Sequence, residues 1–249
     1  MQTSIPPNVT RFMYKNIHAL FMEMCTNPAH FEKIEYYKLA SQETITNALD
    51  SIKDNKTDDE KMDTLFQIGF EVGGNLLNKF WLPKKSLVDV IDYYFNKEFK
   101  NNYVIGIQLR NQYLDLKNDL DKFYNCALEL EENVKQSNKN KTVKWFISTD
   151  SEKLSNIIKK LYPAKAISAN GTITHTHFHS VGQARAIIDI ELLSKCDEII
   201  MSGGSTFGYV ASMKNKKLPY YIDGKSSMKK CLRTVLSSPS RTPSGSAIF

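Results

Sequence analysis

The segment from Arg185 to Ser212 constrains the fold more than any other stretch, because it reads as helix, strand, tight turn and helix without interruption. Two isoleucines and a methionine at 199–201 form a short strand-like run, and two glycines follow directly. Paired glycines allow a sharp turn, after which Ser205 or Thr206 can cap a second helix. The free N–H groups at the start of that helix would face outward. We therefore predict an anion site that suits phosphate.

From Tyr103 onward, short apolar runs alternate with helical patterns. The expected strands are Tyr103–Gln108, Thr142–Ile147, a short one near Ala166 or Ile173, Glu198–Met201 and Leu218–Ile222. The expected helices are Leu116–Val134, Ser151–Leu161, Gly182–Ser194 and Thr206–Met213. This alternation predicts an α/β fold with a Rossmann-like, doubly wound parallel sheet. Such sheets bind ligands outside the carboxyl ends of their strands, where Arg110, Asp150 and Ser205 all fall.

Three regions are expected along the chain: a helical N-terminal region over 1–100, an α/β domain over 101–235 and a disordered Ser/Pro-rich tail over 236–249. Within the first region, 62–80 has apolar residues at helix spacing, and residues 81–83 end that pattern. Gly73 and Gly74 count against a helix there, since each costs about 1 kcal/mol in a helix interior. A further helix is expected over 85–96.

Length and charge exclude some classes of partner. The 249 residues are enough to bury a core, and the net charge of +6 comes mostly from lysine runs. These runs lie at 135–144, 214–217 and 225–230, and we interpret them as solvated surface. No basic stripe alternates with exposed aromatic residues as a stacking groove would require, so nucleic acid is not an expected partner.

The cysteines and the hydropathy pattern bear on metal and membrane. Cys25, Cys126, Cys196 and Cys231 lack the spacing of zinc ligands, which argues against structural zinc and leaves disulfides open. The N-terminus has no basic region followed by an apolar core, and there is no run of about 18 apolar residues. We expect no signal peptide and no membrane segment in this chain.

Three motifs carry a family resemblance: DIELLSKCDEIIMSGGSTFGYVASM, GIQLRN and, more loosely, WFISTDSEKL. They resemble the plant-type GDP-fucose-dependent fucosyltransferases, the family of xyloglucan fucosyltransferase, over about Tyr103 to Met213. The resemblance implies the donor half of a GT-B glycosyltransferase that moves L-fucose from GDP-fucose to a glycan hydroxyl with inversion. It further implies a galactose-containing acceptor, no cofactor or metal, and a Golgi membrane protein with a lumenal catalytic part. The chain would then be a fragment, an isoform or a divergent soluble relative.

Arg110 occupies the place of that family's phosphate-binding arginine. It follows an apolar strand, so its guanidinium would project from the strand end toward a diphosphate. Paired bonds to the β-phosphate would strengthen as charge gathers on the leaving GDP, which makes Arg110 the expected catalytic residue. The alternative is a salt bridge that merely caps the sheet edge.

Asp189 and the start of the last long helix complete the expected donor site. Asp189 lies among isoleucines and needs a polar partner. The resemblance implies that it accepts guanine N1–H and the 2-amino group, while the alternative is an i,i+4 pair with Arg185. The helix-start residues would hold phosphate oxygens through backbone N–H groups and hydroxyls. They are Ser205, Thr206, Phe207 and Gly208.

Other polar residues leave alternatives open. Asp150 can bond a ribose hydroxyl or the base, or it can cap the following helix. His175, His177 and His179 share one face of an extended segment, and we expect them to flank the donor pocket or to be exposed rather than to bind metal. Asp119 and Asp121 lie within a helical pattern, where positions i and i+2 diverge around the axis, so we do not expect them to form a metal site.

Residues 1–100 are too short and too helical to hold an acceptor on their own. The alternative function is therefore a GDP-binding or partner-binding module that lacks turnover because the acceptor domain is incomplete.

Overall fold

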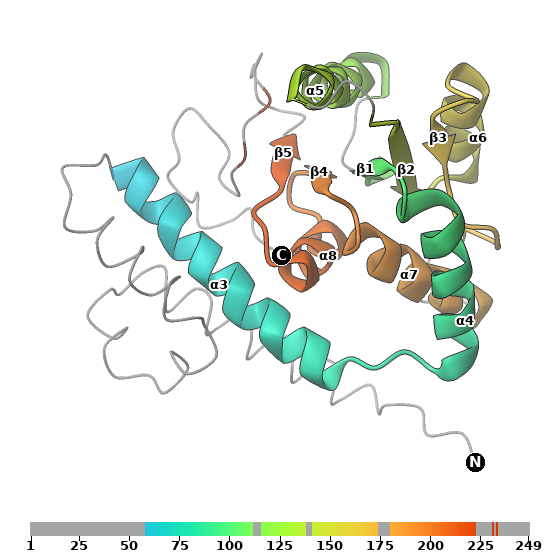
Figure 1. The fold of residues 1–249 in the computed structure, drawn as a ribbon, viewed down its shortest axis with the longest axis horizontal. Helices are drawn as coiled ribbons and strands as arrows, with labels where there is room; N and C mark the ends of the chain where they lie inside the picture. The colour runs from blue at the N-terminus through green and yellow to red at the C-terminus, as the bar shows by residue number, and fades with distance from the viewer. Residues whose placement is uncertain are drawn as a thin grey trace.

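The computed structural model describes residues 58–111, 116–137, 141–173 and 180–222, together with Cys231 and Arg233. Its centre is a five-stranded parallel sheet with the strand order β3-β2-β1-β4-β5 (Figure 1). The strands are β1 (Tyr103–Leu109), β2 (Val143–Thr149), β3 (Ala166–Ile167), β4 (Glu198–Ser202) and β5 (Tyr220–Ile222). The predicted α/β fold with a doubly wound sheet is confirmed.

The helices also follow the periodicity of the sequence. They are α3 (Asp58–Phe80), α4 (Lys85–Tyr94), the π-helix η3 (Phe95–Phe99), α5 (Leu116–Ser137), α6 (Glu152–Leu161), α7 (Ser180–Leu193) and α8 (Thr206–Asn215). Most predicted ends differ from these by three residues or fewer. The last strand begins at Tyr220 rather than Leu218, and Pro219 between them has no N–H to give to a sheet ladder.

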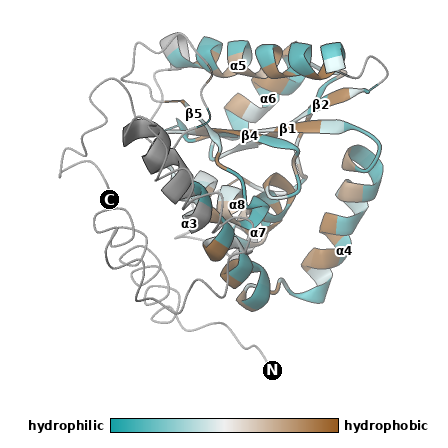
Figure 2. Cartoon of the chain, turned by 60° about the vertical axis from the view of Figure 1, so that its left-hand side comes forward, coloured by the Kyte–Doolittle hydropathy of each residue, from teal (hydrophilic) through white to brown (hydrophobic). Residues whose placement is uncertain are grey.

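The sheet has a hydrophobic core on each face. Helices α5 and α6 cover one face, and α4, α7 and α8 lie on the other (Figure 2). Side chains of β1 alternate between the two cores: Ile105 and Ile107 belong to the core under α5 and α6, and Val104 belongs to the opposite core. Because both faces are covered, the strands read as nearly continuous apolar runs, which is typical of parallel sheets.

Helix α3 packs closely against α8 (Figure 1). The Nε2 of Gln67 donates to the carbonyl of Lys216 at 2.8 Å, and the Nδ2 of Asn78 donates to the carbonyl of Lys214 at 3.1 Å. A Cβ on Gly74 would lie 2.1 Å from the backbone oxygen of Met213. The glycine that weakened the helical pattern is therefore explained by the close approach of the two helices.

A disulfide joins Cys126 on α5 to Cys231, and Cys196 is a buried free thiol. Within the residues that the structure describes, no helix combines the length and the apolar character that a membrane span requires. Several expectations lie outside the described residues, namely those for the first 57 residues, for Cys25, for the three histidines and for the 236–249 tail.

Candidate functional site

Arg110 and the glycine turn meet at the carboxyl edge of the sheet. Arg110 directly follows β1, and its backbone N donates to the hydroxyl of Ser202 at 2.9 Å. Ser202 is the last residue of β4 and leads into Gly203, Gly204 and α8. The strand order 3-2-1-4-5 reverses between β1 and β4, and open α/β sheets bind ligands at such a switch point.

The Arg110 guanidinium is held by Asp150. Nη1 lies 2.8 Å from Oδ2 of Asp150, and the other carboxylate oxygen accepts the backbone N–H of Asn111 at 2.8 Å. The side chains of Arg110 and Asp150 keep 24% and 20% of their surface exposed, so a ligand in solvent can reach both. The salt bridge considered for Arg110 is present, and it leaves part of the guanidinium open to solvent.

The interpretation of Asp150 as a helix cap is wrong. Ser151 is the N-cap of α6, and its hydroxyl accepts the backbone N–H of Leu154 at 3.3 Å. A serine directly before the helical pattern was the available signal, because Ser is a preferred N-cap residue whose hydroxyl accepts a backbone N–H of the first turn. Asp150 is thereby left to bind Arg110 and Asn111.

The start of α8 presents a run of main-chain amides. Gly204 has a φ of 71°, which turns the chain, and Ser205 follows as the N-cap. The first intrahelical bond runs from Tyr209 N to Ser205 O at 3.1 Å, so the amides of Phe207 and Gly208 lie in the first turn, where a helix supplies no carbonyl partner. The Ser205 side chain is buried and makes no capping bond, which corrects the expected hydroxyl cap.

Gly208 allows this turn to lie directly on the sheet. A Cβ at that position would be 2.9 Å from both Oε1 of Gln108 and Cβ of Met201. The first turn of α8 therefore rests on the ends of β1 and β4, which brings its amides to the same edge as Arg110. A side chain at position 208 would push them apart.

Asp189 is buried, and each of its carboxylate oxygens accepts a hydrogen bond inside the protein. Its Oδ1 accepts from Nε of Arg185 at 2.8 Å, and its Oδ2 accepts from the hydroxyl of Ser148 at 3.2 Å. Burial raises the pKa of Asp189 to about 6, against the opposing effects of Arg185 and Ser148. The pair with Arg185 that the sequence left as an alternative is thus present, and a base-reading role stays a prediction.

The sequence analysis did not single out several buried polar strand residues near this edge, among them Gln108, Ser148 and Ser202. Each of these three is 3% exposed or less and sits in a strand whose other residues are mostly apolar. A polar residue near the carboxyl end of such a strand was the signal, because buried polar groups need designated partners. Asp119, in contrast, pairs with Lys122 on α5 at 2.9 Å.

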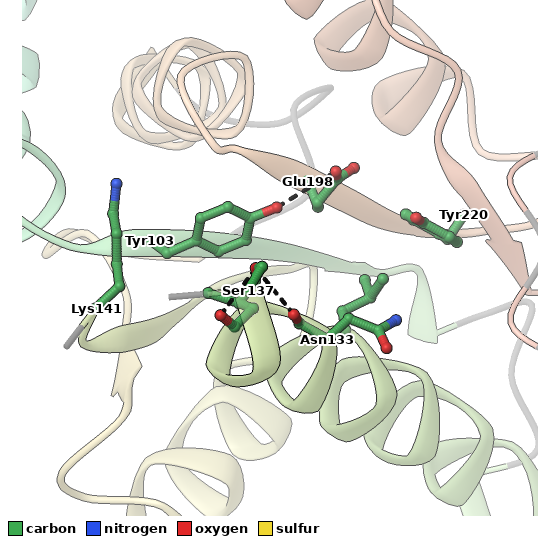
Figure 3. A pocket seen from close by; sticks show the side chains of 8 residues that line it. Tyr103, Asn133, Ser137, Lys141, Glu198 and Tyr220 are labelled. Atoms are coloured by element: carbon green, nitrogen blue, oxygen red, sulfur yellow. Dashed lines mark hydrogen bonds between the residues drawn. The ribbon is translucent and has the colours of Figure 1, made fainter. Parts of the chain in front are cut away.

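A pocket of about 370 Å³ lies at the opposite edge of the sheet (Figure 3). Tyr103, Glu198 and Tyr220, the first residues of three strands, line it together with residues of α5. Oε1 of Glu198 accepts from the Tyr103 hydroxyl at 3.4 Å, and Oε2 accepts from Arg233. Burial raises the pKa of Tyr103. This pocket is separated from Arg110 by the length of β1.

No protein-family model matches the sequence, and no curated protein matches it. Similar solved structures include the fucosyltransferase NodZ from Bradyrhizobium, with 22% identity, coverage of 57% of this chain and 45% of that chain, and a TM-score of 0.43. Another is Arabidopsis thaliana FUT1 in complex with GDP, with 20% identity, coverage of 66% and 38%, and a TM-score of 0.46. This chain therefore spans less than half the length of either protein.

Proposed function

We propose that this chain is the donor-binding part of a fucosyltransferase that moves L-fucose from GDP-fucose to a glycan hydroxyl. A galactose-containing acceptor and inversion at the anomeric carbon are part of the proposal. The observation that supports it is the 2.9 Å contact between Arg110 N and the Ser202 hydroxyl, which holds the backbone of Arg110 beside the end of β4, the strand that leads into α8. The motif resemblance supports fucose and guanosine as the donor chemistry.

The proposed chemistry uses electrostatic stabilisation. As the acceptor oxygen attacks the anomeric carbon, the bond to the β-phosphate oxygen breaks and negative charge collects on GDP. Arg110 and the amides of Phe207 and Gly208 stabilise that charge, and the hydroxyls of Ser205 and Thr206 are proposed to assist. No cofactor or metal is invoked. Removing one donor aimed at developing charge costs about 100- to 1,000-fold in kcat.

Asp189 is proposed to read guanine. An ionised carboxylate offers about four lone-pair sites, and two of those on Asp189 accept from Arg185 and Ser148. Two sites therefore remain for guanine N1–H and the 2-amino group. With a pKa of about 6, the group is mostly ionised at neutral pH and can accept both bonds.

Titration calorimetry with GDP, UDP and ADP tests the donor, followed by a GDP-fucose hydrolysis and transfer assay. We expect GDP to bind more tightly than UDP or ADP, and Arg110→Ala to lose both affinity and turnover. Arg233→Ala is the matched control, because Arg233 is also ion-paired but lies at the opposite edge of the sheet. Equal GDP binding by wild type and Arg110→Ala would overturn the proposal.

A second candidate is a GDP-binding or partner-binding module without turnover. The described part of the chain before β1 consists of helices that pack on α7 and α8, and it contributes no strand that could build an acceptor domain. GDP binding that is lost in Arg110→Ala, with no hydrolysis or transfer, would favour this module. Residence in the Golgi lumen or membrane rests on the family resemblance alone, and imaging of the tagged protein would test it.

A further inference from the structure

We infer that Ser202 and Gln108 are positioning residues that hold Arg110 at a fixed place relative to the first turn of α8. We call these two residues the edge clamp. The inference rests on the proposed function, because Arg110 and that turn are the proposed diphosphate site. Neither clamp residue touches the ligand in this proposal; both act through the backbone.

Ser202 extends the connection between β1 and β4 beyond the end of their ladder. Paired residues of the two strands end at Gln108 and Met201, two positions before Arg110. The Ser202 hydroxyl accepts the Arg110 N–H at 2.9 Å and donates to the carbonyl of Gln108 at 3.3 Å. This side chain is fully buried, so water cannot replace either bond. One hydroxyl thus ties the base of the arginine to β4.

The side chain of Gln108 also connects β1 to β4. Its Oε1 accepts the backbone N–H of Ser202 at 3.3 Å, and the residue is 3% exposed. The same oxygen lies beneath Gly208, where an added Cβ would come within 2.9 Å of it. Gln108 therefore supports both the residue that precedes the glycine turn and the first turn of α8.

The two ends of the Arg110 side chain are held by different residues. The edge clamp sets where the side chain starts, and Asp150 holds Nη1 at 2.8 Å. The backbone of Arg110 is thus held beside β4, while the guanidinium is held by Asp150, which follows β2 on the other side of β1. Because electrostatic stabilisation depends on preorganised geometry, a shift of about 1 Å at such a site can cost about 100-fold in rate.

Substitution of Ser202 tests the inference by calorimetry with GDP, well below the unfolding temperature. We expect Ser202→Ala to weaken GDP binding about tenfold, the effect of one buried hydrogen bond, and Ser202→Thr to restore most of it. Ser212→Ala is the matched control, because this α8 hydroxyl is buried with no hydrogen-bond partner among the described residues. We expect that control to bind GDP as wild type does.

A double-mutant cycle with Arg110→Ala separates positioning from a general structural role. If the edge clamp acts through Arg110, Ser202→Ala should cause little further loss of GDP affinity when Arg110→Ala is already present. Fully additive losses, or unchanged affinity in Ser202→Ala alone, overturn the inference and leave the proposed function intact. Equal GDP binding by wild type and Arg110→Ala overturns both.

Gln108→Met provides a second variant in case Ser202→Ala does not fold. It keeps the side-chain volume close to that of glutamine and removes the oxygen that Ser202 N and Gly208 meet. We expect Gln108→Met to reduce GDP affinity as Ser202→Ala does. The reduction should be smaller when Arg110→Ala is already present. Wild-type affinity in a folded Gln108→Met protein would remove Gln108 from the clamp.

Discussion

Asp150 holds two consecutive residues with its two carboxylate oxygens, the guanidinium of Arg110 and the backbone N–H of Asn111. A bound diphosphate would compete with this carboxylate for the guanidinium or would share it. An arginine has five N–H donors, so sharing is possible without breaking the pair. We therefore interpret Asp150 as a residue that orients Arg110 and not as a competitor of the diphosphate.

Asp150→Ala tests that distinction at the level of one side chain. We expect GDP affinity to fall several-fold, because Arg110 loses the contact that orients its guanidinium. Asp150→Asn should fall less, since its carbonyl oxygen can still accept from Asn111. Titration calorimetry with GDP measures both variants. A rise in affinity for Asp150→Ala would instead show that the carboxylate competes with phosphate.

Asp189 should make stability depend on pH. Its pKa is about 6 in the folded protein and near 3.8 when unfolded, so the folded state binds more protons between these values. The Asp189 contribution to the free energy of unfolding is then fully present below about pH 4 and is lost as pH rises through about 6. Relative to Asp189→Asn, the free energy of unfolding of wild type should fall by on the order of 3 kcal/mol over this pH window.

Urea unfolding of wild type and Asp189→Asn from pH 4 to 7.5 measures this difference. The sign follows from burial outweighing the attraction of Arg185. If the stability of wild type relative to the variant rises with pH, the ion pair outweighs burial, and the pKa of Asp189 is lowered rather than raised.

At the scale of elements, periodicity and chain breaks were sufficient to predict where helices and strands lie. Apolar runs of five to seven residues between helical patterns correspond to β1, β2 and β4. The packing of α3 on α8 was not predictable, because it depends on two segments more than a hundred residues apart. Gly74 looked unfavourable in isolation and proves to lie where α3 comes close to the backbone of α8.

Gly74→Ala should destabilise the protein although alanine favours helix. A Cβ would meet the backbone oxygen of Met213 at 2.1 Å, and a backbone atom cannot rotate away. We expect a loss of about 1–3 kcal/mol, as for other overpacked sites, seen as a lower unfolding temperature. Lys79→Ala, at an exposed position of the same helix, is the control and should change little. A stabilised Gly74→Ala protein would mean that the two helices can separate at no cost.

At the scale of the whole molecule, the Cys126–Cys231 disulfide ties α5 to the segment after β5. It spans 105 residues and encloses β2, β3, β4 and β5, while the central strand β1 precedes Cys126 and lies outside the loop. Cross-links that close long loops restrict the unfolded chain most in the loop-entropy account. This covalent link therefore restricts four strands of the sheet together rather than a single element.

Cys231→Ser should lower the free energy of unfolding by about 2–4 kcal/mol. A reducing agent should lower that of wild type by a similar amount and should leave the variant unchanged, which urea unfolding with and without reductant measures. Cys196→Ala removes a buried thiol that is outside the disulfide and should keep the sensitivity to reductant. Wild-type stability that is insensitive to complete reduction would contradict this expectation.

The sequence by itself determined the kind of elements, their order and the edge at which the candidate site lies. Helix and strand periodicities are local, and the carboxyl ends of parallel strands meet at one edge, so Arg110 and the glycine turn could be assigned to the same edge in advance. Only the tertiary structure decided which groups touch: Arg110 with Asp150, Arg110 N with Ser202, and Asp189 with Ser148. These contacts join separate strands and helices, and their partners follow from strand order and packing, which no local pattern encodes.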